Sequence, residues 1–225
     1  MAHGSVGLGR SMWVSAGLAI VMAMTSVVSS GPTSAAASDE VVMDRGPLNR
    51  IACPEGVVPS GGLIDTAGAH GFSVDCLVWW GITQGVSETE FAPDRELSRA
   101  QLATFLYRVL ERTAQPIPDP QVGFSDVRGG PHREAIEVLA TLQVIGGVGE
   151  GRFAPEQTVT RGQLAAMITR LHREVIGATI IPADAPFTDV PGTTHEQAIQ
   201  QLVALGVTQG TSATTFGPGA PVLRG

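Results

Sequence analysis

Three arginines occupy equivalent points of a repeated pattern, and their type and spacing suggest a site for anions. Each arginine comes 29 residues after a histidine, and a leucine, a glycine and a phenylalanine recur between them in register. The repeated positions are His70, Leu77, Gly85, Phe91 and Arg99; His132, Leu139, Gly147, Phe153 and Arg161; and His195, Leu202, Gly210, Phe216 and Arg224. Landmarks that stay in register across three copies identify a repeat protein.

Two of these arginines open a predicted helix. Ser98 and Gln101, like Thr160 and Gln163, form S/T-x-x-Q capping boxes, whose side chains satisfy backbone donors at a helix start. An arginine in the first turn faces the positive end of the helix dipole, which costs about 0.3–1 kcal/mol. We therefore expect a compensating anion near each arginine.

The compensating anion could be internal or bound. Asp65, Asp126 and Asp189 could each form a salt bridge with the arginine of their own repeat and hold that repeat together. Alternatively, the carboxylate or phosphate of a ligand could be held by the guanidinium and by free backbone donors of the helix start. The two roles are compatible if the aspartate orients an arginine that also meets the ligand.

The histidines and two tryptophans are less decisive. A histidine at a helix start can cap the helix, bond to its neighbours or contact a sugar hydroxyl, and we favour capping. A three-histidine metal site on the symmetry axis would need the histidines to converge, which nothing in the sequence indicates, so we predict no metal site. Trp79 and Trp80 could stack on a sugar, although the apolar run Val74–Ile82 favours a core position for at least one.

Each copy predicts a helix, a turn-rich loop and a second helix, so the expected fold class is mainly α. Apolar residues recur at helical spacing in both helices of the copies. In the first helix these are Val74, Leu77, Val78 and Trp80; Ala135, Ile136, Leu139 and Leu142; and Ala198, Ile199, Leu202 and Leu205. In the second helix they are Leu102, Phe105, Leu106, Val109 and Leu110, and Leu164, Met167, Ile168 and Leu171.

The N-terminus has the features of a secretory signal peptide. Arg10 precedes the apolar stretch Met12–Val28, and Ser34-Ala35-Ala36-Ala37 then gives a small-x-small cleavage signal. An uncleaved membrane anchor is the alternative, because a stretch of 17 residues is at the short limit for spanning a bilayer. The proline and the alanines that follow favour cleavage, so we predict a signal peptide over residues 1–37, and no membrane contact after its removal.

Two cysteines in an exported chain favour a disulfide. A bond between Cys53 and Cys76 would tie the segment before the first repeat to the first helix. Free buried thiols, a metal pair or a thiol nucleophile beside His70 are the alternatives. The absence of C-x-x-C spacing argues against zinc, and export argues against a reactive thiol.

Composition and motifs argue against several classes of function. The chain has 14 basic residues, none of them lysine, against 21 acidic ones, and its net charge of −7 becomes −8 if Arg10 leaves with the signal peptide. Such a chain lacks the basic face that nucleic-acid binding requires. G-x-S-x-G, H-E-x-x-H, Walker and dinucleotide-binding motifs are absent. We therefore predict a protein that is not an enzyme, uses no cofactor and binds no nucleic acid.

Phe124-Ser125-Asp126-Val127 and Phe187-Thr188-Asp189-Val190 resemble the F-x-D-V opening of S-layer homology domains. The resemblance continues through the Ala-Ile-x-x-Leu helix, the loop glycine, the F-x-P step and the V-T-R-G-Q entry to the second helix, and it covers residues 63–225. It implies three tandem repeats with pseudo-threefold symmetry. It also implies that they anchor an exported protein to a cell-wall glycan, either an acidic secondary polymer or peptidoglycan.

The ligand-binding residues expected from this resemblance are the repeated polar residues and the loop glycines. They are Arg99, Arg161, Arg224, Asp65, Asp126, Asp189, His70, His132, His195, Gly85, Gly147 and Gly210. The chain departs from the family pattern where Gln101 and Gln163 replace an acid, and where a tryptophan is missing near the second and third histidines. The first copy also opens with Ile64-Asp65-Thr66 instead of F-x-D-V. These departures concern the ligand more than the fold.

The predicted organisation is a leader, 38–62, and repeats over 63–113, 124–177 and 187–225. The third repeat is expected to be incomplete, because its second helix would begin at Arg224; either the chain is a fragment or another segment fills the gap. The predicted function is noncatalytic anchoring at the cell wall or cell surface. The alternatives are a fragment of a larger exported hydrolase or peptidase, and a structural surface protein that binds a protein partner.

Overall fold

The computed structural model describes residues 52–68 and 70–225. The predicted signal peptide and residues 38–51 of the predicted leader lie outside the described residues. The helices described are α3 (Gly71–Trp79), α4 (Arg99–Glu111), α5 (Arg133–Thr141), α6 (Arg161–Ile176) and α7 (Glu196–Ala204). In this part of the chain, β-structure is limited to isolated bridges. The predicted mainly α class is therefore confirmed.

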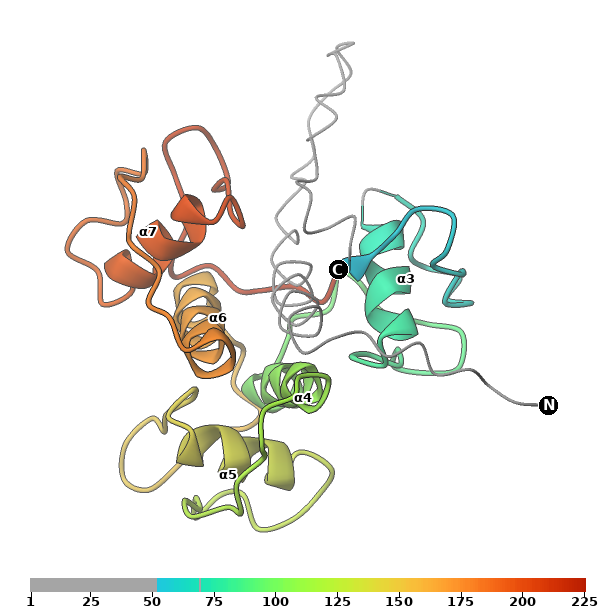
Figure 1. Cartoon of the computed structure of the whole chain (residues 1–225), viewed down its shortest axis with the longest axis horizontal. Helices are drawn as coiled ribbons and strands as arrows, with labels where there is room; N and C mark the ends of the chain where they lie inside the picture. Colours follow the sequence, from blue (N-terminus) through green and yellow to red (C-terminus); the bar gives the residue numbers. More distant parts are fainter. Residues whose placement is uncertain (1–51, 69) are drawn as a thin grey trace.

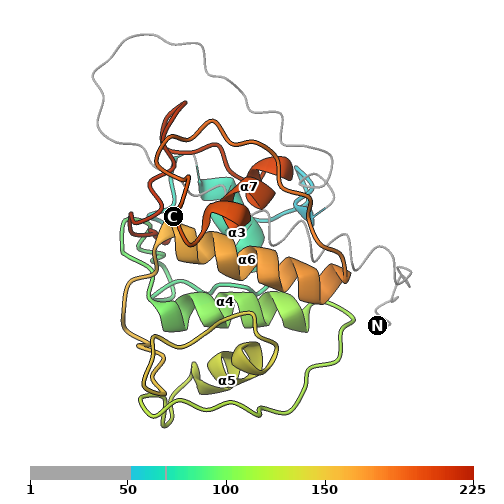
Figure 2. The same cartoon turned by 90° about the vertical axis from the view of Figure 1, so that its left-hand side faces the viewer.

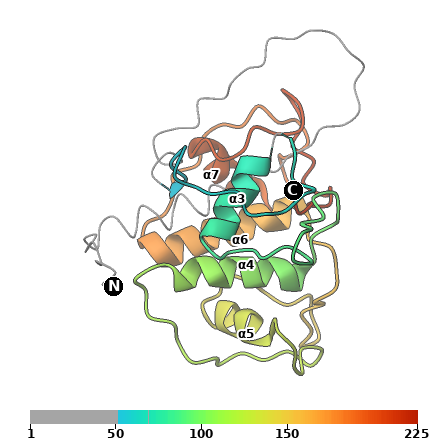
Figure 3. The same ribbon diagram turned by 90° about the vertical axis from the view of Figure 1, so that its right-hand side faces the viewer.

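The helices form three lobes around a centre. α3, α5 and α7 are short and lie in separate lobes, while α4 and α6 are longer and are seen almost end-on in the middle of Figure 1. α4 packs against both α5 and α6, and α6 packs against α7 (Figures 2 and 3). Each long helix therefore contacts the short helix of the next repeat.

Local sequence explains where the long helices begin. The Ser98 hydroxyl accepts a hydrogen bond from the Gln101 backbone N–H at 3.2 Å, and the Gln101 side chain accepts one from the Ser98 N–H. Thr160 and Gln163 form the same reciprocal pair at the start of α6. Both predicted capping boxes are confirmed. At its other end α6 stops at Gly177, whose φ of +71° suits a residue without a Cβ.

Three backbone hydrogen bonds join the repeats in a closed triangle at the centre of the fold. The Leu97 N–H donates to the Val222 carbonyl at 2.8 Å, the Val222 N–H to the Val159 carbonyl at 3.0 Å, and the Val159 N–H to the Leu97 carbonyl at 3.0 Å. All three residues are buried. Because buried backbone groups must be paired, each repeat supplies a donor or acceptor that another repeat needs.

The hydrophobic core also crosses repeat boundaries. A single cluster of buried residues contains Leu106 of α4, Leu139 of α5, Ile168 of α6 and Leu202 of α7. Burying a side chain of this size contributes about 1.5–3 kcal/mol. The repeats are therefore stabilised largely by one another.

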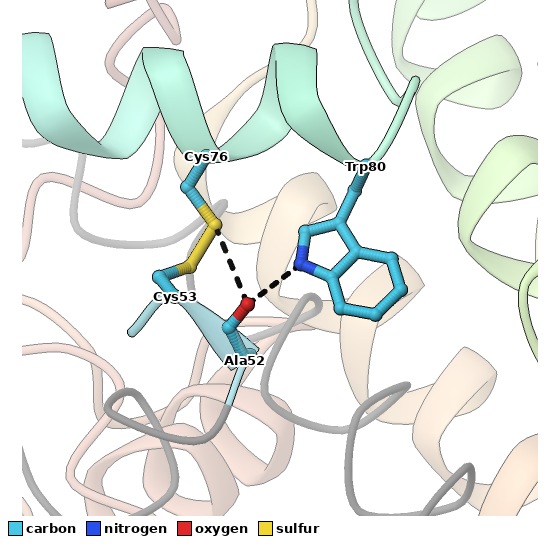
Figure 4. Close-up of a disulfide and its surroundings, with 4 residues drawn as sticks. All are labelled: Ala52, Cys53, Cys76 and Trp80. Carbon is cyan, nitrogen blue, oxygen red and sulfur yellow. Dashed lines mark hydrogen bonds between the residues drawn. A yellow bond between two sulfur atoms is a disulfide. The ribbon is translucent and has the colours of Figure 1, made fainter. Parts of the chain in front are cut away.

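The lobe of α3 carries the predicted disulfide between Cys53 and Cys76, which is confirmed (Figure 4). Beside it, the Trp80 indole N–H donates to the Ala52 carbonyl at 2.7 Å. Trp80 is partly buried and packs against the core, whereas Trp79 is 42% exposed. The bond and the indole together hold the segment that precedes the first repeat against the inner side of α3.

We expect reduction of this disulfide to lower the free energy of unfolding by about 2–4 kcal/mol, because the bond closes a loop of 23 residues in sequence and so restricts the unfolded chain. Urea denaturation with and without reductant measures the change. A Cys53→Ser/Cys76→Ser variant is the control and should not respond to reductant. Equal stability of the oxidised and reduced protein would show that the segment is held by packing alone.

Candidate functional site

The three repeated aspartates bind backbone at the F-x-P step. Both Asp126 carboxylate oxygens accept hydrogen bonds, one from the Phe153 N–H and one from the Ala154 N–H, each at 2.8 Å. Asp65 makes the same pair of bonds in its loop, and Asp189 does so in the third repeat, at 2.7–2.9 Å. The carboxylates therefore fix the loop that follows each short helix.

The repeated arginines grip the phenylalanines of these same loops. Arg99 Nε donates to the Phe153 carbonyl at 2.9 Å, and its guanidinium carbon lies 4.5 Å from the centre of the Phe153 ring. The aspartate thus takes the N–H of the phenylalanine, and the arginine takes its carbonyl and one face of its ring. We call this unit an arginine–phenylalanine clamp. A cation over an aromatic face contributes about 0.5–2 kcal/mol when desolvated.

Each clamp joins two different repeats, and together they close a ring. Arg161 Nε donates to the Phe216 carbonyl at 2.8 Å, and its guanidinium carbon lies 4.4 Å from the centre of the Phe216 ring. Arg224 contacts the first repeat: its Nε donates to the Phe91 carbonyl at 2.9 Å, and its guanidinium carbon lies 4.8 Å from the centre of the Phe91 ring. In Figure 1 the chain crosses the molecule from the α7 lobe to end beside the first repeat.

The expected salt bridge within each repeat is wrong. The ion pairs of 4.0 Å or less between described residues join other side chains. Asp126 lies near Arg99 of the preceding repeat, Asp189 near Arg161, and Asp65 near Arg224. Burial lowers the pKa of each arginine, and the nearby aspartate offsets only part of that lowering. The expected pairing is wrong because each arginine contacts the loop of the next repeat around the ring. That loop is held by the aspartate of the next repeat, and not by the aspartate of the arginine's own repeat.

The helix starts are not open to an anion through their backbone donors, which corrects a second expectation. The Arg99 N–H donates to the Gln157 carbonyl at 2.9 Å, and the Ala100 N–H to the Pro155 carbonyl at 3.0 Å. The corresponding donors of α6 are paired in the same way with residues 218 and 220. With the capping boxes in place, the first-turn N–H groups are already bonded. Any ligand must therefore be met by side chains.

The three arginines differ in their outer nitrogens. All are buried, with 3% of Arg99, 7% of Arg161 and 6% of Arg224 exposed. Arg99 Nη2 donates to the Gly146 carbonyl at 2.7 Å. In contrast, Nη2 of Arg161 and of Arg224 is buried without a hydrogen-bond partner among the described residues. Buried polar groups without partners are rare in native structures, so these two nitrogens need an explanation.

Burial and neighbouring groups shift the pKa values of the charged side chains in the clamps. Burial lowers the pKa of Arg99, Arg161 and Arg224, and the neighbouring aspartates oppose that shift. The backbone N–H bond from the phenylalanine is the main reason that the pKa of each clamp aspartate is lowered below its usual value. The clamps thus hold a cation and an anion on either side of the same peptide unit.

Comparison with known proteins gives this arrangement a family. The family model described as the S-layer homology domain matches residues 81–103, 123–165 and 186–225, one segment in each repeat. The chain belongs to the S-layer homology family. This confirms the resemblance in the sequence, and it matches the threefold arrangement of the clamps.

Relatives of the chain share this module as part of longer proteins. It is 29% identical over 110 residues to a cellulosome-anchoring protein of Acetivibrio thermocellus, covering 48% of this chain and 24% of that protein. It is 27% identical to an S-layer protein of Bacillus thuringiensis subsp. finitimus, over 68% of this chain and 18% of that protein. An endoglucanase of a Bacillus species is 27% identical over 61% of this chain and 14% of the enzyme. The chain thus spans less than a quarter of the length of each of these relatives. Such surface proteins agree with the predicted location outside the cytoplasm, at the cell wall or cell surface.

The loop glycines of the S-layer homology repeats have a steric role. A Cβ at Gly147 would lie 2.6 Å from the Arg152 carbonyl oxygen, and one at Gly85 would lie 2.5 Å from that of Glu90. Gly210 is similarly close to the Thr215 carbonyl, and its φ is +80°. Each glycine lets the loop approach the residue before the clamp phenylalanine, so its repetition follows from packing.

The histidines do not cap their helices as expected. His70, His132 and His195 occupy the N-cap positions of α3, α5 and α7 but make no capping hydrogen bond through their side chains. His132 Nδ1 instead lies 2.6 Å from the Thr104 hydroxyl of α4. When that hydroxyl donates to the Ala100 carbonyl, His132 is the donor in the pair. The three histidines belong to separate lobes, and no group of three metal-ligating side chains occurs among the described residues.

Sequence reasoning missed the partners of the arginines. The repeated phenylalanines were evident as landmarks, but a carbonyl acceptor leaves no mark in the residue types. The aromatic ring in register with each arginine was the one available signal, since a guanidinium stacks well on such a face.

In the described part of the chain, no helix has the length and apolar character needed to cross a bilayer.

We expect the clamp aspartates to make the protein sensitive to acid. Their pKa values are lowered on folding, so the unfolded chain binds more protons near pH 3–4, and stability is lost as pH falls through the folded values. The midpoint of urea unfolding, followed from about pH 6 to about pH 2, should fall more steeply for the natural chain than for Asp65→Asn/Asp126→Asn/Asp189→Asn. Parallel curves for the two proteins would contradict this role.

Proposed function

We propose that this chain is a noncatalytic anchoring module that retains an exported protein on an acidic cell-wall polysaccharide. Membership of the S-layer homology family carries the proposal, because this domain is a cell-surface anchoring module. The match extends across three repeats, which the structure joins into one ring. The glycan is a secondary cell-wall polymer or peptidoglycan.

The unpaired guanidinium nitrogens support a direct role for two arginines in holding the polymer. Nη2 of Arg161 and of Arg224 would gain a partner from a carboxylate or phosphate oxygen, and charge-assisted bonds of this kind are stronger than neutral ones. Arg99 has its corresponding donor committed to Gly146. The three repeats would therefore contribute unequally: Arg161 and Arg224 meet the ligand, and Arg99 chiefly closes the ring.

Several weak contacts on one chain would act together. Once one site engages a polymer, the others meet it at a raised effective concentration, and overall retention can exceed that of a single site by orders of magnitude. The ring also keeps the sites at fixed spacing, so little ordering is needed on binding. Rigid presentation matters here because the chain carries a net charge of −7 and approaches an anionic wall without long-range attraction.

A structural surface protein is the second candidate, and the clamps themselves favour it. Every clamp arginine is bound to protein on at least one side, which is a sufficient reason for its repetition. In this case the arginines would stabilise the ring, and a partner protein would meet another face. A catalytic role within a longer protein, such as the related endoglucanase, would lie outside these repeats.

Co-sedimentation with purified wall sacculi tests the anchoring proposal. Protein recovered after export should pellet with intact sacculi and should stay in solution once their acidic secondary polymer has been removed chemically. Pelleting that survives the treatment would make peptidoglycan the ligand. A folded protein that does not pellet with intact sacculi would contradict anchoring by this chain.

We expect Arg161→Gln and Arg224→Gln to reduce retention on sacculi at least tenfold relative to Arg99→Gln, because only the first two remove an unpaired donor. All three substitutions leave a phenylalanine carbonyl without its partner and should cost about 1–3 kcal/mol of stability. Arg99→Gln, which also leaves the Gly146 carbonyl without its partner, is the control. Thermal denaturation of the three variants measures how much stability each substitution costs. Equal retention by all three variants would favour the structural candidate.

A further inference from the structure

The lobe of α3 differs from the other two in what lies beside its short helix. α5 packs against α4, and α7 packs against α6, so each has the long helix of the preceding repeat as its neighbour. α3 packs against none of the other described helices, and it stands apart from them in Figure 1. Around the ring, the repeat that precedes the first is the third, whose arginine already reaches the first lobe. The neighbour that the pseudo-symmetry assigns to α3 is therefore not among the described helices.

The buried side chains of this lobe are also less connected to the common core. Ile136 of α5 and Ile199 of α7 both belong to that core. Val74, at the equivalent position of α3, belongs instead to a small separate cluster with Leu63 and Phe91. The packing that joins the second and third lobes to the core is thus only partly present in the first.

The third repeat lacks the capping residue with which the other two begin a long helix. Ser98 and Thr160 precede the first arginine of their helices, and their hydroxyls accept first-turn N–H groups. Leu223 stands at this position before Arg224, and its side chain has no oxygen. Loss of such a cap costs a helix about 0.5–2 kcal/mol. The third repeat is therefore less suited than the others to begin a long helix.

The short helices of the first and third repeats bind the incoming chain at the same position. In the third repeat, Gln201 Nε2 donates to the Ile180 carbonyl at 2.9 Å, just after the chain has left α6. Cys76 occupies the equivalent position of α3 and is bonded to Cys53 (Figure 4). The chain before Cys53 therefore approaches α3 from the direction in which a long helix precedes the third repeat.

The predicted leader has the length and the apolar residues to fill this place. Residues 38–51 are comparable in number to α4, with 13 residues, and to α6, with 16. Leu48, Ile51 and Ala52 recur at helical spacing behind Pro47, which suits the first turn of a helix. The backbone of Ala52 is helical. An apolar face thus precedes the disulfide directly.

We propose that residues 38–51 dock beside α3 in the place of the third long helix and complete the ring from the N-terminal side. Leu48 and Ile51 face the core. Phe105 of α4 forms part of the surface that receives the leader, because its ring centre lies 5.8 Å from the guanidinium carbon of Arg224, where a third long helix would begin. The disulfide then holds the docked segment at one end.

Proline shapes the docked segment. Pro47 has no N–H to donate and disfavours a helical conformation at Gly46, so the leader bends there instead of forming one unbroken helix. The apolar run Val41–Met43 lies before the bend and covers the part of the surface nearer to Phe105. The leader is therefore a substitute for the long helix in packing, with a different backbone.

Hydrogen exchange followed by mass spectrometry on the exported full chain tests the docking. In the oxidised protein, the amides of residues 40–51 should exchange at least about a hundredfold more slowly than in a free peptide of the same sequence. Exchange at the free-peptide rate throughout residues 40–50 would overturn the proposal, since the disulfide alone would then account for the position of Cys53.

Two double variants test which face of the leader is docked. Leu48→Asp/Ile51→Asp should bring exchange in residues 40–51 to the free-peptide rate and lower the midpoint of urea unfolding, because it places carboxylates against an apolar surface. Asn49→Asp/Arg50→Asn makes the same change in charge on the other face and should leave both readouts unchanged. Retained protection in α6 shows that each variant is folded. Equal effects of the two double variants would contradict the proposal.

The same experiment distinguishes another occupant of this place. Exported protein that retains residues 12–28, with protection there and none at residues 40–51, would assign the place to the apolar stretch of the predicted signal peptide and would overturn the proposal. The measurement uses no sacculi, so its failure would leave the anchoring proposal standing.

Discussion

The burial of a charged guanidinium at each passage from one repeat to the next is the constraint on which this structure depends. A buried cation without partners would be strongly destabilising, so the chain must deliver a carbonyl, an aromatic face and a nearby carboxylate to each arginine. The F-x-P loop supplies the first two, and the aspartate ahead of the short helix holds that loop in place. The repeats are therefore completed by one another, and the arginine of the third repeat must return to the first.

This constraint separates what the sequence can predict from what it cannot. Helices, capping boxes and the disulfide follow from local periodicity, from residues three apart and from the compartment, so they were predictable. The partner of Arg99 lies 54 residues ahead and is a backbone carbonyl, which any residue could provide. The aspartate was expected to pair with its own arginine, but the geometry assigns it to the loop backbone. The N–H groups at the helix starts looked free for the same reason, because their acceptors are carbonyls of another repeat.

Departures from perfect repetition carry the functional argument. Arg99 has both Nε and Nη2 bonded to protein carbonyls, while Arg161 and Arg224 each keep a buried Nη2 without a partner among the described residues. Tyr107 of α4 donates to the Glu134 carboxylate of α5, whereas Thr169 and Gln197 stand at the equivalent positions of α6 and α7. The common ring can thus tolerate differences at its periphery, since the clamps and the central triangle do not involve those positions. A module of this kind can keep one fold and vary how each repeat meets a ligand.

Native-state hydrogen exchange at the amides of Leu97, Val159 and Val222 tests most directly whether the repeats form one closed ring. These three amides donate the central bonds, one from each repeat. If the ring opens as a unit, they should share one opening free energy, and Arg161→Ala should lower the protection of all three together. Loss of protection at Val222 and Val159 alone, with Leu97 unchanged, would show that the repeats open independently and would contradict the closed ring.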